Sequence, residues 1–299
     1  MNSDGGGTMN SDHRRQVRPG RVVLYGVITC GAAIMLIPLS WMVLTSLKTF
    51  VEVLQEPTRW IPALAQWSNY RVVFQEFDFG LYLWNSVFVT AMSITGSLIS
   101  CCLAAYAFVF IDVRFKGPIF AALLSTMLLP AQVTIIPLFK FFATIGWVNT
   151  YLPLILPHWL GLNVFAIFLM RQFFLTIPKA YVEAARMDGA SELSILWNVV
   201  VPLSTPVLLA ATVFTFLASW NDLFGPLIYL HDERLFTMPI GLFSFIAKAG
   251  VLEGGGGTAV TPWNLVMSLT TVMIVPVIVV FFLAQKRFIE GVAASGLKG

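Results

Sequence analysis

Residues 178–202 read PKAYVEAARMDGASELSILWNVVVP and place a polar segment between two long apolar runs. The pattern predicts two short helices around a tight turn. Thr176 and Pro178 suit the start of the first helix, because a hydroxyl can cap free N–H groups and proline tolerates the first turn. Gly189 suits its end, since a left-handed residue costs least without a Cβ. Ser191 is then placed to cap the second helix.

The second predicted helix has one apolar face, which consists of Ile195, Leu196, Val199 and Val200. Pro202 opens the apolar run that follows. A solvated hairpin that only joins two membrane spans would account for these features. The alternative is a docking surface for another protein.

The composition of the chain excludes a soluble protein. Of the 299 residues, 58% are hydrophobic and only 11% are charged, whereas soluble domains have about 25% charged residues. The 25 Phe and 9 Trp residues are too many for a soluble surface to hide. We therefore expect an all-α, polytopic membrane protein.

Six apolar runs are each long enough to cross about 30 Å of hydrocarbon as a helix. They are Val22–Ser46, Tyr82–Phe110, Pro118–Leu138, Leu152–Met170, Leu203–Leu230 and Trp263–Ala284. This predicts a six-helix transmembrane domain over 22–285, preceded by a disordered cytoplasmic tail over 1–21 and followed by a cytoplasmic tail over 286–299. The first run is too long for a signal peptide. Because MNSD occurs at residue 1 and again at Met9, either methionine could be the start.

The distribution of basic residues predicts the orientation. With six spans and the N-terminus inside, the inner segments contain 12 of the Lys and Arg residues and the outer segments contain 6. A two-to-one excess supports an N-in, C-in topology. Residues 178–202 would then be cytoplasmic. The outer segment 231–262, with glycines at 254–257, reads as a mobile excursion.

The polar segment resembles a known motif. Glu183-Ala184-Ala185, then Asp188-Gly189-Ala190, then Pro202-Leu203 and Pro206 look like the EAA loop of permease subunits of ATP-binding-cassette importers. In that family the loop is a coupling helix that docks into a groove on the ATPase subunit. The resemblance implies coupling roles for the following residues: Glu183, Ala184, Ala185, Asp188, Gly189 and Pro202.

The resemblance to the carbohydrate-uptake, maltose-permease type of this family runs from the first span to the last residue. It includes Asn69-Tyr70, Asn85-Ser86, Arg114–Gly117, Gly146–Tyr151, Arg171–Phe174 and the C-terminal Gln285–Gly299. Only residues 1–20 and the glycines at 254–257 are unmatched.

Few polar residues lie inside the spans. Asp222 is the one carboxylate well inside a run, and an unpaired charge there would cost about 2.5–3.5 kcal/mol. Trp220-Asn221-Asp222 is similar to a stretch in the fifth span of carbohydrate-type permeases. We predict that Asn221 and Asp222, with His158 and Asn163, line the translocation path. The alternatives are an interface anchor for the acid and hydrogen bonds to neighbouring helices for His158 and Asn163.

Several site types are excluded or unsupported. The chain lacks a G-x-x-x-x-G-K-[ST] phosphate loop, so it is not itself an ATPase. Its three histidines are scattered, which predicts no metal site and no catalytic residues. Three cysteines within apolar runs predict packing roles rather than disulfides. Four small residues at four-residue spacing (Ser93, Ser97, Cys101 and Ala105) predict close helix packing.

The resemblance implies an ATP-driven, binding-protein-dependent importer for a sugar or oligosaccharide that works by alternating access. The implied partners are a second homologous permease subunit, an ATPase dimer that holds ATP and Mg, an extracellular solute-binding protein and membrane lipid, with no nucleic acid. This chain itself would bind no cofactor, in a bacterial plasma (inner) membrane. The alternatives are glycerol 3-phosphate or another polar solute as cargo, or a stand-alone secondary transporter, for which the single Asp222 is weak support.

Overall fold

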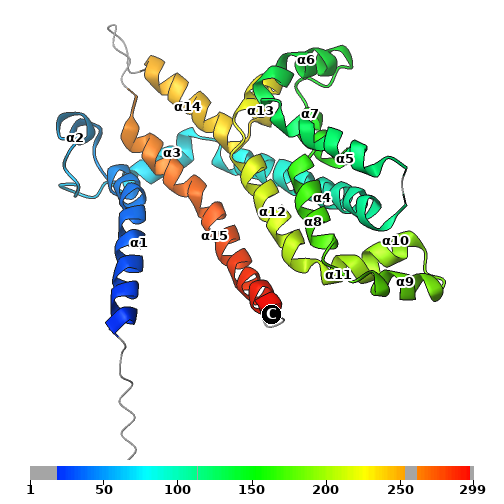
Figure 1. Ribbon diagram of the computed structural model, residues 1–299. Helices are drawn as coiled ribbons and strands as arrows, with labels where there is room; N and C mark the ends of the chain where they lie inside the picture. Colours follow the sequence, from blue (N-terminus) through cyan, green and yellow to red (C-terminus); the bar gives the residue numbers. More distant parts are fainter. Residues whose placement is uncertain (1–18, 113, 253–260, 297–299) are drawn as a thin grey trace, which may run out of the picture.

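The computed structural model describes residues 19–112, 114–252 and 261–296. Within these ranges the ordered elements are all helices and there is no strand, so the all-α prediction is confirmed. The elements are α1 (Pro19–Ser46), α2 (Phe50–Gln55), α3 (Ser68–Glu76), α4 (Phe79–Phe110), α5 (Lys116–Ser125), η1 (Thr126–Leu128), α6 (Ala131–Thr144), α7 (Leu152–Trp159), α8 (Val164–Phe174), α9 (Lys179–Met187), α10 (Glu192–Ile195), the π-helix η2 (Leu196–Val200), α11 (Val201–Leu203), α12 (Thr205–Trp220), α13 (Phe224–Tyr229), η3 (Glu233–Leu235), α14 (Met238–Leu252) and α15 (Trp263–Gly296). Figure 1 shows their arrangement.

Four helical segments of the described chain are long and apolar enough to cross a membrane. They are Val23–Ser46, Phe79–Phe110, Leu152–Phe174 and Trp263–Leu283. These correspond to the first, second, fourth and sixth predicted spans. Two further apolar segments are sharply bent pairs of helices, and counting each pair as one span gives up to six.

The prediction of a single helix over 118–138 is wrong. Lys116–Leu128 and Val133–Thr144 meet at 102°. Pro130 lies in the break, where it cannot donate the hydrogen bond that a continuous helix would need.

The predicted span 203–230 also differs. Its helix ends at Trp220, and a separate short helix, α13, follows after a break. The segment before it, Glu192–Leu203, meets Thr205–Trp220 at 85°. Proline on both sides of this bend, at 202 and 206, removes two backbone donors and explains why the helix does not continue straight.

The predicted tails and the outer segment are more helical than expected. α1 begins at Pro19, inside the segment 1–21 that was predicted to be disordered, and α15 continues to Gly296 through the predicted tail 286–299. About half of the expected excursion 231–262 is the helix α14. Residues 1–18 and the glycines at 254–257 lie outside the described ranges.

α4 is the central helix of the bundle. It contacts α7, α8, α12 and α14. The four small residues that predict close packing are all buried at 0–1% exposure (Ser93, Ser97, Cys101 and Ala105), so this prediction is confirmed. Beyond them, the last turns of α4 join α8, α9, α10, η2 and α12 in one apolar core. Cys101 and Cys102 belong to this core as free thiols.

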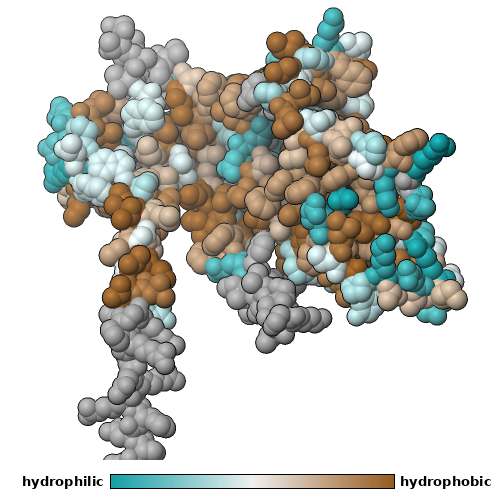
Figure 2. All heavy atoms as spheres, in the orientation of Figure 1, coloured by the Kyte–Doolittle hydropathy of each residue, from teal (hydrophilic) through white to brown (hydrophobic). Residues whose placement is uncertain are grey.

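α1 lies apart from this core and packs on α15 (Figure 1). Its described apolar side chains are mostly exposed, and within the candidate span Val23–Ser46 only Thr45 and Ser46, at its end, are buried. Figure 2 shows brown, apolar side chains on α1 and across the bundle, whereas hydrophilic side chains gather over the α9–α10 hairpin. An all-round apolar helix of this length is suited to lipid or to other membrane helices.

Candidate coupling site and membrane pocket

The predicted turn at Gly189 is present. Gly189 has φ +80°. Its amide bonds the carbonyl of Arg186 (3.0 Å), and the Ala190 amide bonds the carbonyl of Ala185 (3.0 Å). This pair of bonds is the Schellman motif, which satisfies the free carbonyls at the end of α9.

The two predicted helix starts have different outcomes. The Ser191 hydroxyl accepts a hydrogen bond from the amide of Ser194 (3.3 Å), so the predicted cap of α10 is confirmed. Pro178 occupies the N-cap of α9, but the prediction for Thr176 is wrong. The Thr176 hydroxyl donates to the carbonyl of Phe173 (2.7 Å) in the preceding helix, and so it faces away from α9.

One face of the hairpin is buried and the other is exposed. Val182 of α9, with Ile195, Leu196 and Val200, is at most 1% exposed. The predicted coupling residues Glu183, Ala184, Asp188 and Gly189 are exposed, and Ala185 is half-buried. The exposed face also has large apolar side chains, namely Tyr181, Met187, Leu193 and Trp197. Exposed apolar groups among charges are typical of a surface that binds a partner.

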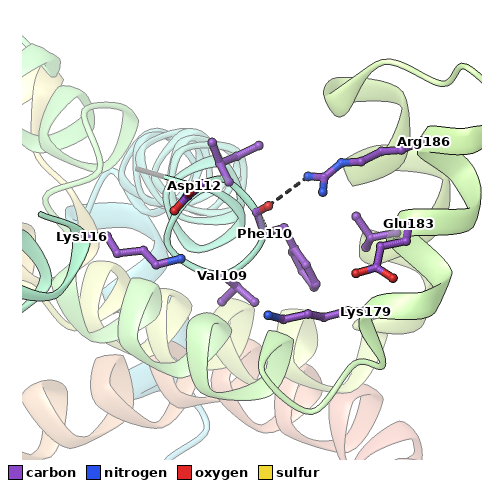
Figure 3. Close-up of a pocket in the computed structure, with 9 residues that line it drawn as sticks. Val109, Phe110, Asp112, Lys116, Lys179, Glu183 and Arg186 are labelled. Carbon is purple, nitrogen blue, oxygen red and sulfur yellow. Dashed lines mark hydrogen bonds between the residues drawn. The ribbon is translucent and has the colours of Figure 1, made fainter. Parts of the chain in front are cut away.

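Charged side chains surround a hollow of about 210 Å³ between α9 and the end of α4. Figure 3 shows Asp112 and Lys116 on one side and Lys179, Glu183 and Arg186 on the other. The dashed line marks the bond from Arg186 to the carbonyl of Phe110, the last residue of α4 (2.9 Å). The hairpin is thus attached to α4 as well as to its chain neighbours.

Glu192 connects the two arms of the hairpin to α4. Its carboxylate accepts two hydrogen bonds from Arg186 (2.7 and 3.0 Å) and one from the Tyr106 hydroxyl (2.5 Å). The hydrogen bonds to Glu192 raise the pKa of the Arg186 guanidinium, and those from Arg186 lower the pKa of the Glu192 carboxyl. We call Tyr106, Arg186, Glu192 and the Phe110 carbonyl the Arg186–Glu192 network.

No sequence pattern predicted this network. Arg186 and Glu192 are six residues apart, on different helices, so no helical spacing pairs them. Tyr106 lies near the end of the apolar run Tyr82–Phe110. Only the Gly189 turn brings the two charges together, and only tertiary packing brings Tyr106 to them.

The chain bends sharply between α11 and α12, where the fifth span was predicted to begin. Pro202 lies in α11, two residues before the 85° bend. The Ser204 side chain in the bend is completely buried, and the hydroxyl of Thr205 donates to the carbonyl of Pro202 (2.9 Å). The hairpin therefore meets α12 at a sharp bend in which Ser204 is buried, while Pro202, Leu203 and Thr205 are exposed.

Two of the four predicted path residues share a pocket. His158 of α7 and Asp222, between α12 and α13, line a hollow of about 210 Å³ with Ser219 and Thr237. His158 Nδ1 and Thr237 Oγ1 are buried without a hydrogen-bond partner within the described chain. Asp222 Oδ1 accepts a bond from the Gly225 amide (3.0 Å). The pocket thus offers a carboxylate, an imidazole and hydroxyls to a polar solute.

The other two predicted path residues lie elsewhere. Asn163 caps α8 through the Ala166 amide (3.2 Å) and donates to Ser97 Oγ (3.0 Å) and Thr215 Oγ1 (3.2 Å). Asn163 therefore joins α4, α8 and α12. This matches the alternative that its side chain bonds neighbouring helices instead of lining the path. Asn221 is exposed and donates back to the carbonyl of Leu217 (2.8 Å).

Within the described residues, no three side chains of His, Cys, Asp or Glu are placed to hold a metal ion. The charged groups of the hairpin are exposed, and the polar groups of the pocket do not form a nucleophile–base pair. The structure has an exposed hairpin surface at one end of the helical bundle and a polar pocket inside the bundle.

The fold and these two sites define a class: a polytopic helical membrane protein with a protruding hairpin, as expected for a transport component. Comparison gives the family. A family model described as "Binding-protein-dependent transport system inner membrane component" matches residues 102–293. The chain belongs to this family, and it is a bacterial inner membrane protein.

Characterised relatives are similar over nearly the whole chain. The sulfoquinovosyl glycerol transport system permease protein SmoH of Agrobacterium fabrum is 30% identical, over 88% of this chain and 89% of the relative. The sn-glycerol-3-phosphate transport system permease protein UgpE of Yersinia enterocolitica is 32% identical, over 90% and 94%. A crystal structure of a bacterial ABC transporter involved in the import of the acidic polysaccharide alginate has a chain with TM-score 0.77 and 27% identity, over 92% of this chain and 98% of that one.

Proposed function

We propose that this chain is the transmembrane permease subunit of an ATP-driven importer for a sugar or oligosaccharide. The observation that carries the proposal is the α9–α11 hairpin, which presents the EAA-type residues Glu183, Ala184, Asp188 and Gly189 on an exposed surface. The names of the permease relatives support the class of system, and SmoH and the alginate transporter support a carbohydrate-like cargo. The partners would be a second permease subunit, an ATPase dimer and an extracellular solute-binding protein.

In this proposal the chain binds no cofactor and catalyses no reaction, and ATP and Mg are held by the ATPase subunits. Closure of the ATPase dimer moves the docked hairpin, and α8 and α12 follow because they adjoin it directly. Glu183 contacts the ATPase or orients the loop, Asp188 and Gly189 fix the turn, and Pro202 fixes the joint to α12. Ala184 and Ala185 are small enough for a partner backbone to approach closely. The rigid movement of these helices would give alternating access.

The pocket favours a neutral cargo over glycerol 3-phosphate. A phosphate group is bound best by Arg, Lys or several backbone amides. The pocket side chains are those of Val89, Leu154, His158, Ala218, Ser219, Asp222, Pro226 and Thr237. Its one carboxylate would repel a phosphate, while carboxylate, imidazole and hydroxyl groups suit the hydroxyls of a sugar. Glycerol 3-phosphate is the second candidate for the cargo, because the UgpE relatives are named as permeases for it.

Crosslinking tests the proposed docking. We expect a Glu183→Cys variant, in a background without the three native cysteines, to crosslink to a cysteine in the groove of the ATPase subunit in the purified complex. Glu56→Cys, exposed in the segment after α2, is the control that should not crosslink. Absence of any crosslink from position 183 in an assembled, active complex would overturn the proposal.

Reconstitution tests the class of transporter. Proteoliposomes with the full complex and the binding protein should take up labelled sugar only when ATP is inside. Uptake by this polypeptide alone, driven by a proton or sodium gradient, would instead identify a secondary transporter. Competition by glycerol 3-phosphate but not by sugars would move the cargo to the second candidate.

A further inference from the structure

We propose that α4 is a third helix through which this permease couples to its ATPase, and that the Arg186–Glu192 network makes the connection. This inference rests on the proposed function. The chain order attaches the hairpin only to α8 and α12. The network adds α4, which is some seventy residues away from the hairpin in sequence.

The bonds of the network join three helices at one carboxylate. Arg186 comes from α9, Glu192 is the first residue of α10, and Tyr106 belongs to the last turn but one of α4. Arg186 also bonds the Phe110 carbonyl, which lies at the end of α4, where carbonyls have no partner within the helix. A two-pronged Arg–carboxylate pair fixes the relative orientation of its partners; because this pair is exposed to solvent, its contribution in energy is small.

An apolar core lies directly behind the network. Val182, Ile195 and Leu196 of the hairpin pack in the same cluster as Tyr106 and Phe110 of α4. A hairpin that slid relative to α4 would break the charged bonds and expose these side chains together. We therefore infer that the hairpin and the end of α4 move as one body.

This body reaches the membrane pocket. α4 has 32 residues and so extends about 48 Å at 1.5 Å per residue. Val89, about two-thirds of the way back along it, lines the pocket that contains His158 and Asp222. Movement of the hairpin would thus displace one wall of the pocket through α4, while α12 displaces the wall that contains Ser219.

Variants of the network separate coupling from folding. Three variants are tested in the full complex: Glu192→Gln, Arg186→Lys and Tyr106→Phe. Sugar uptake and the ATP hydrolysis that the binding protein stimulates are measured on the same proteoliposomes. We expect uptake per ATP to fall about fivefold or more, while ATP hydrolysis stays stimulated. The exchanged pair Arg186→Glu with Glu192→Arg should recover part of the lost coupling. Arg71→Gln, an exposed loss of one positive charge on α3, away from the hairpin, is the control and should leave uptake per ATP unchanged.

A purely structural role would give a different result. Uptake and ATP hydrolysis would then fall in proportion to the amount of assembled complex, and uptake per ATP would equal that of the wild type. That outcome, or an unchanged ratio in fully assembled variants, overturns the inference.

A crosslink across the hollow of Figure 3 gives an independent test. Asp112→Cys and Lys179→Cys place two exposed thiols on opposite sides of it, in a background without native cysteines. If the hairpin and α4 move together, joining them with a short bifunctional reagent leaves uptake intact. If uptake stops after crosslinking and recovers on cleavage of the linker, the two parts separate during transport and the inference is wrong. The Glu183→Cys experiment is independent of this one, so docking can hold while the role of α4 fails.

Discussion

At the scale of single residues, polar side chains mark the junctions between helices. The Asn69 amide donates to the carbonyls of Ser46 (2.8 Å) and Lys48 (2.9 Å), where α1 ends. The Asn85 amide donates to the carbonyls of Arg234 and Phe236, both at 2.9 Å, where α14 approaches α4. Asn149 Oδ1 accepts from the amides at 231 and 232, both at 3.0 Å. These residues, which carry the family resemblance, therefore satisfy backbone groups that lipid or core would otherwise leave unpaired.

Asp222 bonds the backbone amide of Gly225 and also places its carboxyl group in the pocket, and a pair of variants separates the two contributions. Asp222→Asn keeps an oxygen for the Gly225 amide but removes the charge, so we expect unchanged thermal stability and roughly tenfold weaker sugar uptake, since bonds to charged groups contribute about 1.5–3 kcal/mol. Asp222→Ala also removes the backbone bond, which should cost about 0.5–2 kcal/mol of stability. Thermal denaturation and uptake kinetics check the pair. Normal uptake by Asp222→Asn would place the pocket outside the translocation path.

At the scale of elements, close helix packing and helix breaks determine the shape. α4 approaches α7 at Gly96, where the indole of Trp159 lies against the backbone and donates to the carbonyl of Met92 (3.0 Å). A Cβ at Gly96 would overlap this indole. The break near Pro130 turns the chain where a straight span was expected, and the bend near Ser204 lies at the expected start of the fifth span. Small residues permit contact, and prolines redirect the chain.

Two glycines of α4 give a matched pair of variants. Gly96→Ala should destabilise the protein by about 1–3 kcal/mol, because the indole must leave its position. Gly80→Ala lies in the same helix with nothing within 4 Å of the added Cβ, and so it should be neutral or stabilising by up to about 1 kcal/mol. Thermal denaturation in one detergent compares them. Equal stability of the two variants would contradict the packing of α4 on α7.

At the scale of the whole molecule, the structure places several segments at one end of the bundle. The described start of α1, the α9–α11 hairpin and the C-terminal end of α15 all point to the lower side of Figure 1, whereas α2, α6 and α14 lie toward the upper side. This arrangement agrees with the charge distribution, in which 12 of the 18 Lys and Arg residues fall in segments assigned to the inside. The N-in, C-in orientation itself is a prediction.

Cysteine labelling tests the orientation. A membrane-impermeant maleimide added to spheroplasts should label Glu56→Cys but leave Glu183→Cys unlabelled until the membrane is permeabilised. Both positions are exposed in the structure, so in spheroplasts that express this chain without the ATPase subunits access depends only on the side of the membrane. Labelling of Glu183→Cys in intact spheroplasts would reverse the topology and remove the hairpin from any cytoplasmic ATPase.

The sequence by itself determined the class of fold and the local structure of the hairpin. Apolar runs of sufficient length specify membrane helices wherever they occur, and the Gly189 turn and Ser191 cap depend only on nearby residues. The EAA-type residues are also close together in the chain, so their order in the sequence was enough to find them.

Only the tertiary structure decided which polar residues meet. It paired His158 with Asp222 across a pocket, assigned Asn163 to a helix junction and left Asn221 exposed. It also joined Tyr106 and Phe110 of α4 to Arg186 and Glu192, bent the predicted span 118–138 and ended the helix of the predicted span 203–230 at Trp220. Such contacts depend on how separate helices pack, and the packing is set by the shapes of many side chains together, which no local pattern contains.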